Sequence, residues 1–91
     1  MWELMQQLRR LFESTQLTTD EVAKALSEQT GRPIHGAEIR KAMNKDGALT
    51  RKERDVTILA HKYLTKEQER QNREIQTAIR RAASALGETE S

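Results

Sequence analysis

Basic side chains gather in one stretch of the sequence, and clustered lysine and arginine side chains can bind phosphate. Residues 31–54 carry seven basic and three acidic side chains, a net charge of +4. Residues 1–30 carry a net charge of −2, and residues 55–91 carry equal numbers of both signs. Because a polyanion is held largely through counterion release by clustered cations, residues 31–54 are the first candidate for a nucleic-acid contact. A solvated charged surface would give the same pattern.

The other kinds of site chemistry have little support in the sequence. The chain has 91 residues and no cysteine, which excludes disulfides and thiolate metal sites. Its two histidines, His35 and His61, are far apart, and no paired carboxylate accompanies them. Residues 44–53 match part of a calcium-binding loop, but Ala42 occupies the first ligand position. Without a glycine-rich phosphate loop or a nucleophile–base arrangement, we expect no catalytic residue, no metal, no cofactor and no enzyme activity.

The elements that position these residues are predicted to be helices, because apolar residues recur at spacings of three and four. No stretch alternates apolar and polar residues over the length of a strand. A first helix carries an apolar stripe over residues 1–12. Thr18 with Glu21 forms a capping box, which predicts a second helix over residues 19–30. A third, short helix fits residues 36–44.

Two further capping boxes predict the rest of the helices. Thr50 caps a fourth helix whose inward face lies over residues 56–63, and Thr65 caps a fifth helix that runs to about Leu86. The second half of this fifth helix has an apolar stripe, which either closes the core of the monomer or pairs with a second copy. The stripe consists of Ile75, Ala78, Ile79, Ala82 and Leu86.

The predicted fold class is therefore all-α, a small five-helix domain with a long C-terminal amphipathic helix. We expect one domain over residues 1–87 and a disordered tail over residues 88–91. No apolar run approaches the roughly 20 residues of a membrane helix. Residues 1–10 contain too many polar side chains for a signal peptide, so we expect a cytoplasmic protein that does not bind membranes.

The second and third predicted helices carry a pattern that resembles the helix-turn-helix of prokaryotic DNA-binding regulators. The pattern is Val22-Ala23-x-x-Leu26 followed by Ile34-x-x-x-x-Ile39-x-x-Ala42. It covers about residues 19–44, under a third of the chain. The resemblance implies that the third helix enters the major groove of DNA while its apolar side packs beneath the second helix. The sequence departs from the usual pattern because the turn is stretched over residues 27–33.

The resemblance implies that several side chains of residues 31–54 contact the DNA duplex. Arg40 is predicted to donate two hydrogen bonds to a guanine edge, with Lys41 and Asn44 on or near the same exposed face. His35 is predicted to be the N-cap of the third helix. The predicted phosphate contacts are Arg32, Lys45, Arg51 and Lys52. Each of these side chains, taken singly, is also consistent with a surface position without a partner.

The two residues at the start of the third predicted helix have little bulk. Gly36 and Ala37 would let the N-terminus of this helix approach a phosphate backbone or a thymine methyl group.

These observations lead to two hypotheses about function. The first is a small, sequence-specific DNA-binding transcriptional regulator of a phage or mobile element. As a homodimer, it would present two third helices about one DNA turn (~34 Å) apart. The alternative is a helical adaptor or inhibitor that binds a regulatory protein and not DNA. Trp2 and Phe12 would be its anchors, and the chain's net charge of only +2 favours it.

Overall fold

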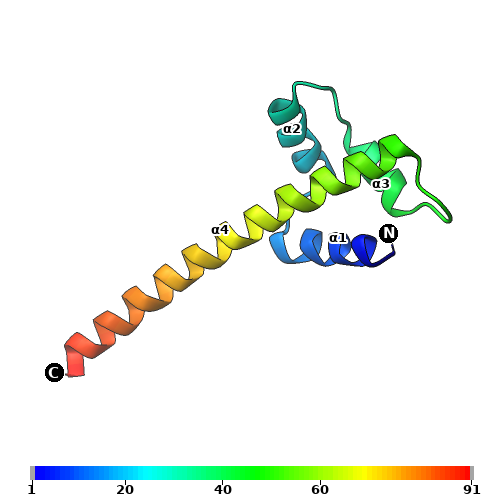
Figure 1. The fold of residues 1–91 in the computed structure, drawn as a ribbon. Coiled ribbons are helices and arrows are strands. Elements are labelled where there is room, and N and C mark those ends of the chain that lie inside the picture. The colour runs from blue at the N-terminus through cyan, green and yellow to red at the C-terminus, as the bar shows by residue number, and fades with distance from the viewer. Residues whose placement is uncertain (1, 91) are drawn as a thin grey trace.

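Four helices make up the part of the chain that the structure, a computed structural model, describes (Figure 1). That part is residues 2–90, with the side chains of Trp2 and of residues 88–90 left out. The helices are α1 (Trp2–Thr15), α2 (Thr19–Thr30), α3 (Gly36–Met43) and α4 (Arg51–Glu90). The all-α fold class is confirmed, and residues 2–90 contain no strand. The predicted number of five helices is wrong.

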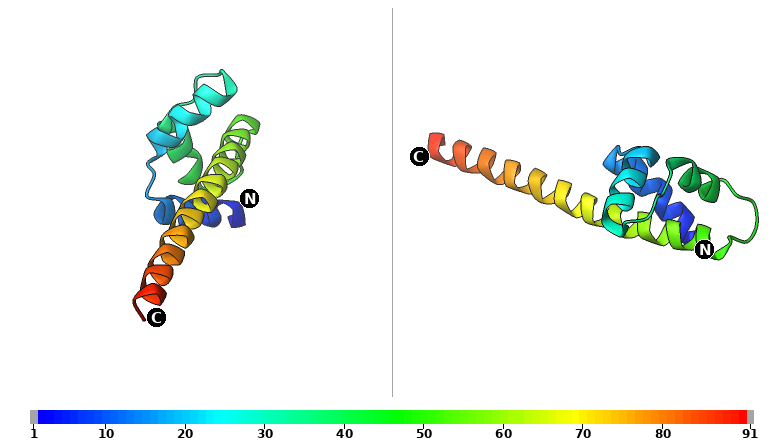
Figure 2. Two further views of the ribbon diagram at one scale, coloured as in Figure 1. Left: turned by 90° about the vertical axis from the view of Figure 1, so that its left-hand side faces the viewer. Right: turned by 90° about the horizontal axis from the view of Figure 1, so that it is seen from above.

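The molecule has two parts, which we call the head and the arm. The head consists of α1, α2 and α3 packed against residues 51–71 of α4. The arm consists of residues 72–90 of α4 and extends beyond the other helices in all three ribbon views (Figures 1 and 2). The whole measures 61 × 28 × 15 Å, and a helix of 40 residues is itself about 60 Å long. The length of the molecule is therefore the length of α4.

The core lies in the head, where each of the four helices contributes apolar side chains. Leu8 of α1, Leu26 of α2 and Ile39 of α3 are at most 1% exposed. Leu64 of α4 packs in the same cluster, together with Ile34 from the loop between α2 and α3. The remaining buried members of the cluster are Val22, Ala23, Val56 and Ala60. Because apolar burial is the main favourable term in folding, these contacts fix how α3 is rotated against α2 and α4.

Local capping interactions set the ends of the head helices as predicted. The Thr18 hydroxyl accepts a hydrogen bond of 3.1 Å from the Glu21 N–H at the start of α2. Gly31 ends α2 in the left-handed region at φ 70°, which glycine adopts without steric cost. At the start of α4, the Thr50 N–H donates to Glu53 Oε1 at 2.9 Å, and the Glu53 N–H donates to Thr50 Oγ1 at 3.2 Å. The capping box at Thr50 is confirmed. At Thr18 the hydroxyl cap of the Glu21 N–H is present, but the Glu21 carboxylate accepts from the Thr18 hydroxyl at 3.1 Å, so the predicted box is only half formed.

The predicted boundary at Thr65 is wrong, because α4 runs through it without a break. The Thr65 hydroxyl donates to the carbonyl oxygen of His61, one turn earlier in the same helix, at 2.8 Å. Neither glycine nor proline lies near this position, so nothing stops the helix. The helix also continues past Leu86 to Glu90. The disordered tail over residues 88–91 stays a prediction, since these side chains and all of Ser91 lie outside the described residues.

We expect Leu64→Ala to lower the free energy of unfolding by about 2–5 kcal/mol, because Leu64 is fully buried and its truncation leaves a cavity. The matched control is Ile58→Ala on the outer side of the same helix, where the side chain is 37% exposed. Its cost should stay below about 1 kcal/mol. Urea unfolding followed by circular dichroism measures both. Equal losses for the two variants would contradict the packing described for α4.

Candidate nucleic-acid interface

The outer side of α3 is exposed to solvent. Ala37, Lys41 and Asn44 are exposed along it. The opposite side of the helix is buried, through Gly36, Ile39 and Ala42. Lys41 forms no ion pair within residues 2–90. The packing thus turns a surface of small, basic and amide side chains toward solvent.

The N-terminal end of α3 packs closely on α2. Gly36 is buried, and a Cβ atom at this position would collide with the carboxylate of Asp20 and lie 3.0 Å from the Asp20 Cα. Because Gly36 has no side chain, α2 can pack closely against the start of α3. Gly36 therefore does not belong to the exposed surface that contains Ala37. His35 is the N-cap residue as predicted, but its side chain makes no capping hydrogen bond.

Arg40, the predicted base contact, is held by the first turn of α2. Its Nη1 donates to Thr19 Oγ1 at 2.7 Å and to Asp20 Oδ1 at 3.3 Å. Arg40 therefore does not project freely into solvent, and its contact with a base stays a prediction. The side chains of Arg40 and Asp20 are 51% and 76% exposed, so this is a surface ion pair. Such pairs contribute about 0–1 kcal/mol, so an external partner can replace Asp20 at small cost.

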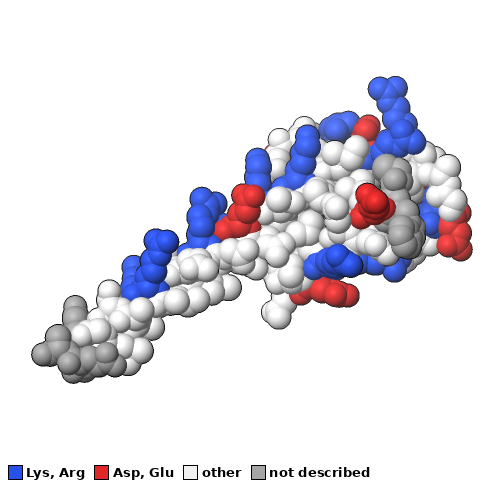
Figure 3. All heavy atoms as spheres, turned by 60° about the horizontal axis from the view of Figure 1, so that its bottom comes forward, with Lys and Arg blue, Asp and Glu red and all other residues white. Residues whose placement is uncertain are grey.

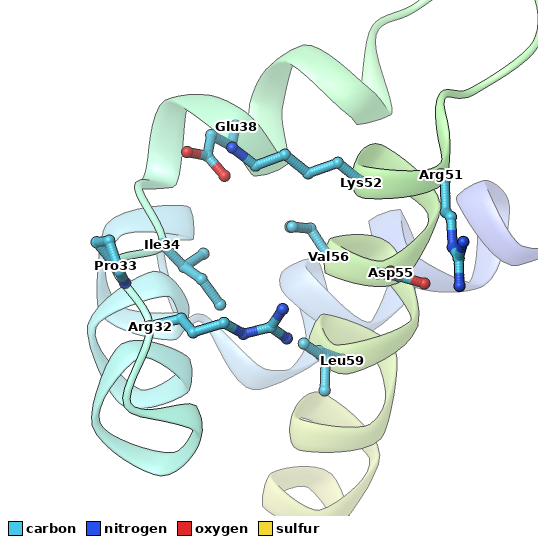
Figure 4. A pocket seen from close by; sticks show the side chains of 9 residues that line it. All are labelled: Arg32, Pro33, Ile34, Glu38, Arg51, Lys52, Asp55, Val56 and Leu59. Carbon is cyan, nitrogen blue, oxygen red and sulfur yellow. The ribbon is translucent and has the colours of Figure 1, made fainter.

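A hollow with an apolar floor and a charged rim lies between the α2–α3 loop, α3 and α4 (Figure 4). Arg32 reaches across it from the loop, and Lys52 of α4 extends toward Glu38 of α3. Arg51 lies on the outer side of α4. The floor is formed by Ile34, Val56 and Leu59. The hollow thus brings cations from two segments that are distant in sequence beside α3.

A second hollow lies between α3 and the first turn of α4, and here the predicted phosphate contact Lys45 is neutralised. Lys45 Nζ lies 2.7 Å from Glu53 Oε1. The hydrogen bond from Lys45, followed by those from the N–H and hydroxyl of Thr50, lowers the pKa of Glu53 from 4.5 to about 2. Lys45 therefore stabilises the start of α4 and is not free to bind phosphate.

The predicted phosphate contacts that remain, with Lys41, form what we call the free cationic surface. None of its members has an ion pair or a side-chain hydrogen bond within the described part of the chain. The surface consists of Arg32, Lys41, Arg51 and Lys52. A further row of basic side chains follows one edge of α4 from head to arm, interrupted by acidic ones (Figure 3). The net charge of residues 55–91 is zero, so the charge count alone does not indicate this row. The basic residues share one edge only because of their spacing along the helix.

The residues predicted to form a partner interface do not lie on one surface. Ile75, Ile79 and Leu86 are 55%, 55% and 66% exposed on the arm, so their stripe does not close the core of the monomer. Phe12 of α1 is half-buried and packs against the core cluster. The side chain of Trp2 lies outside the described residues.

Comparison with known proteins finds no match: no protein-family model fits the chain, and no curated protein and no solved structure is detectably similar to it. The resemblance of residues 19–44 to a helix-turn-helix therefore stays a prediction. Within residues 2–90, no group of three or more histidine, aspartate and glutamate side chains is placed to hold a metal ion. None of the described helices combines the length and apolar content needed to cross a membrane.

The depressed pKa of Glu53 predicts a specific loss of stability in acid. A carboxyl group with a lowered pKa in the folded state stabilises the protein above its ordinary pKa of 4.5, and this contribution disappears as the pH falls toward about 2. Glu53→Gln should therefore flatten the pH dependence of the free energy of unfolding across this range. Glu13→Gln, an exposed carboxylate on α1, is the control. Urea unfolding at a series of pH values tests this, and parallel curves for wild type and Glu53→Gln would contradict it.

Proposed function

We propose that this chain binds double-stranded DNA by placing α3 in the major groove. The observation that carries the proposal is the outer side of α3, where small, basic and amide side chains are exposed and the free cationic surface surrounds them. An α-helix with its side chains is about 10–12 Å in diameter, and the major groove, about 12 Å wide, admits one.

The side chains on α3 suit contacts with base edges. Ala37 has a short side chain in the first turn, so the helix backbone can approach the groove floor there. Lys41 can donate to guanine O6 and N7, and Asn44 can pair with adenine N6 and N7. Arg40 can join them by exchanging Asp20 for a base or phosphate, because the Asp20 pair is weak.

The cations beside α3 suit contacts with phosphates. Arg32 comes from the loop before α3, and Arg51 and Lys52 come from the helix after it. Such contacts orient a protein on the duplex without reading its sequence. Three phosphate contacts would give a slope of about −3 in log affinity against log salt concentration. Sequence-specific binding of this kind would serve transcription regulation.

Binding to a regulatory protein through α1 is less well supported. Phe12, its predicted anchor, packs against the core, so little of its surface is left for a partner.

The test is selection from random duplexes at near-physiological salt, followed by fluorescence anisotropy with the enriched sequence. We expect Lys41→Ala to weaken binding about tenfold and to relax the sequence preference. Arg51→Ala with Lys52→Ala should weaken binding to all duplexes and make the salt slope shallower by about 2. Arg10→Ala removes an exposed cation from α1 and should leave both the affinity and the slope unchanged.

Circular dichroism establishes that each variant retains its helices. Wild-type affinity in both Lys41→Ala and the Arg51/Lys52 double variant would overturn the proposal. Affinity that does not depend on salt would overturn it as well.

A further inference from the structure

The free cationic surface continues along α4 as a row of basic side chains that enters the arm. Starting from Lys52, the residues at successive intervals of seven positions are Leu59, Lys66, Arg73 and Arg80. Because seven residues are close to two helical turns, these residues follow one another along the helix with a drift of only about 20° per interval. Figure 3 shows basic side chains along one edge of α4 from head to arm. We call Lys52, Lys66, Arg73 and Arg80 the basic row.

The apolar position in this series lies in the hollow between the α2–α3 loop, α3 and α4. Leu59 forms part of the floor of this hollow, and Arg32 extends across the hollow toward it (Figure 4). Arg32 therefore supplies a cation where the series itself has none. Lys52 lines the same hollow, so the basic row begins within the surface that is proposed to contact phosphates.

The members of the basic row beyond the hollow are available to an external partner. Lys66, Arg73 and Arg80 are all exposed. None of the three forms an ion pair or a side-chain hydrogen bond within residues 2–90. Their positive charges are therefore not neutralised by the part of the chain that the structure describes.

Two acidic residues near the row are engaged elsewhere. Arg70, which lies beside the row, pairs with Glu67 at 2.7 Å and with Glu74 at 3.2 Å. These carboxylates therefore compensate Arg70 and not the row. Residues 75–87 contain no acidic residue at all, so the positive charge of the row is least compensated in the arm.

We propose that the basic row binds the sugar–phosphate backbone of the duplex that α3 contacts, so that the arm extends the interface along the flanking DNA. The inference rests on the function proposed above and adds a contact that does not read sequence. The row spans 28 residues of continuous helix, or about 42 Å, which is the length of about 12 base pairs. Cations spread over this length are complementary to an extended polyanion and not to a single acidic group.

The arm also brings together donors that suit a phosphate group. A shallow hollow on it is lined by Arg80, Arg81 and Ser84. None of these three side chains has an ion pair or a hydrogen bond within the described residues. Arginine and serine side chains are among the common donors to phosphate oxygens.

Two duplexes separate the contact of the arm from the contact of α3. One carries only the enriched sequence in about 12 base pairs, and the other adds about 15 base pairs on each side, more than the row can span. Fluorescence anisotropy with the full chain measures affinity for both over a range of salt concentrations. We expect the longer duplex to bind about tenfold more tightly, with a salt slope steeper by about 3, because three further cations contact phosphates.

Neutralising the row in the arm should remove most of this gain. Arg73→Gln with Arg80→Gln should make the salt slope on the longer duplex shallower by about 2 and leave binding to the short duplex unchanged. The matched control is Arg10→Gln with Arg54→Gln, which removes the same charge from two exposed positions outside the row. This control should retain the gain, and circular dichroism establishes that both double variants keep their helices.

The outcomes distinguish this inference from the proposed function. Equal affinity of the wild-type chain for the two duplexes, or a gain that the Arg73/Arg80 double variant retains, would overturn the inference and leave the contact of α3 intact. A gain lost equally in the control would show an effect of net charge and would also overturn it. A wild-type chain that binds neither duplex would overturn the proposed function and the inference with it.

Glu69 offers a test in the opposite direction. It lies between Lys66 and Arg73 along α4, is exposed, and forms an ion pair with neither in the described part of the chain. Because a carboxylate there repels phosphate, Glu69→Gln should strengthen binding to the longer duplex about threefold and leave the short duplex unaffected. Glu13→Gln on α1 is the control. An unchanged affinity of Glu69→Gln for the longer duplex would contradict a contact between DNA and this part of the row.

Discussion

The constraint on which the rest of the structure depends is the apolar side of α4, which is longer than the other three helices can cover. Leu64 on this side is fully buried in the head, whereas Ile75, three turns further along, is 55% exposed. Burial of apolar surface is the main driving force for packing, so the covered half determines where α1, α2 and α3 lie. The uncovered half of the same side leaves the arm with a surface suited to another helix.

The packing on α4 also determines what α3 presents to solvent. Ile39 and Ala42 are buried, and their burial turns Lys41 outward. The loop before α3 and the first turn of α4 then bring Arg32 and Lys52 to its sides. The candidate DNA surface and the exposed apolar residues of the arm therefore lie at opposite ends of α4.

Features set by neighbouring residues could be predicted from the sequence, and features set by tertiary contacts could not. The caps at Thr18 and Thr50 depend on hydrogen bonds across three residues, and both are present. The capping pattern at Thr65 is equally good locally, but nothing in that stretch stops a helix that has already begun. The pairing of Arg40 with Asp20 joins two helices. Predicting this pair requires knowing how α2 and α3 cross, which no local pattern specifies.

The central claim is that α4 is one unbroken helix from head to arm. The direct measurement is the distance between spin labels at Ile58→Cys and Arg80→Cys, two exposed positions on the outer side of α4. Labelled protein diluted with unlabelled protein removes distances between copies. Twenty-two residues of continuous helix predict a narrow distribution near 33 Å, plus or minus the label linkers. A broad or markedly shorter distribution would show a break near Thr65 and contradict the account.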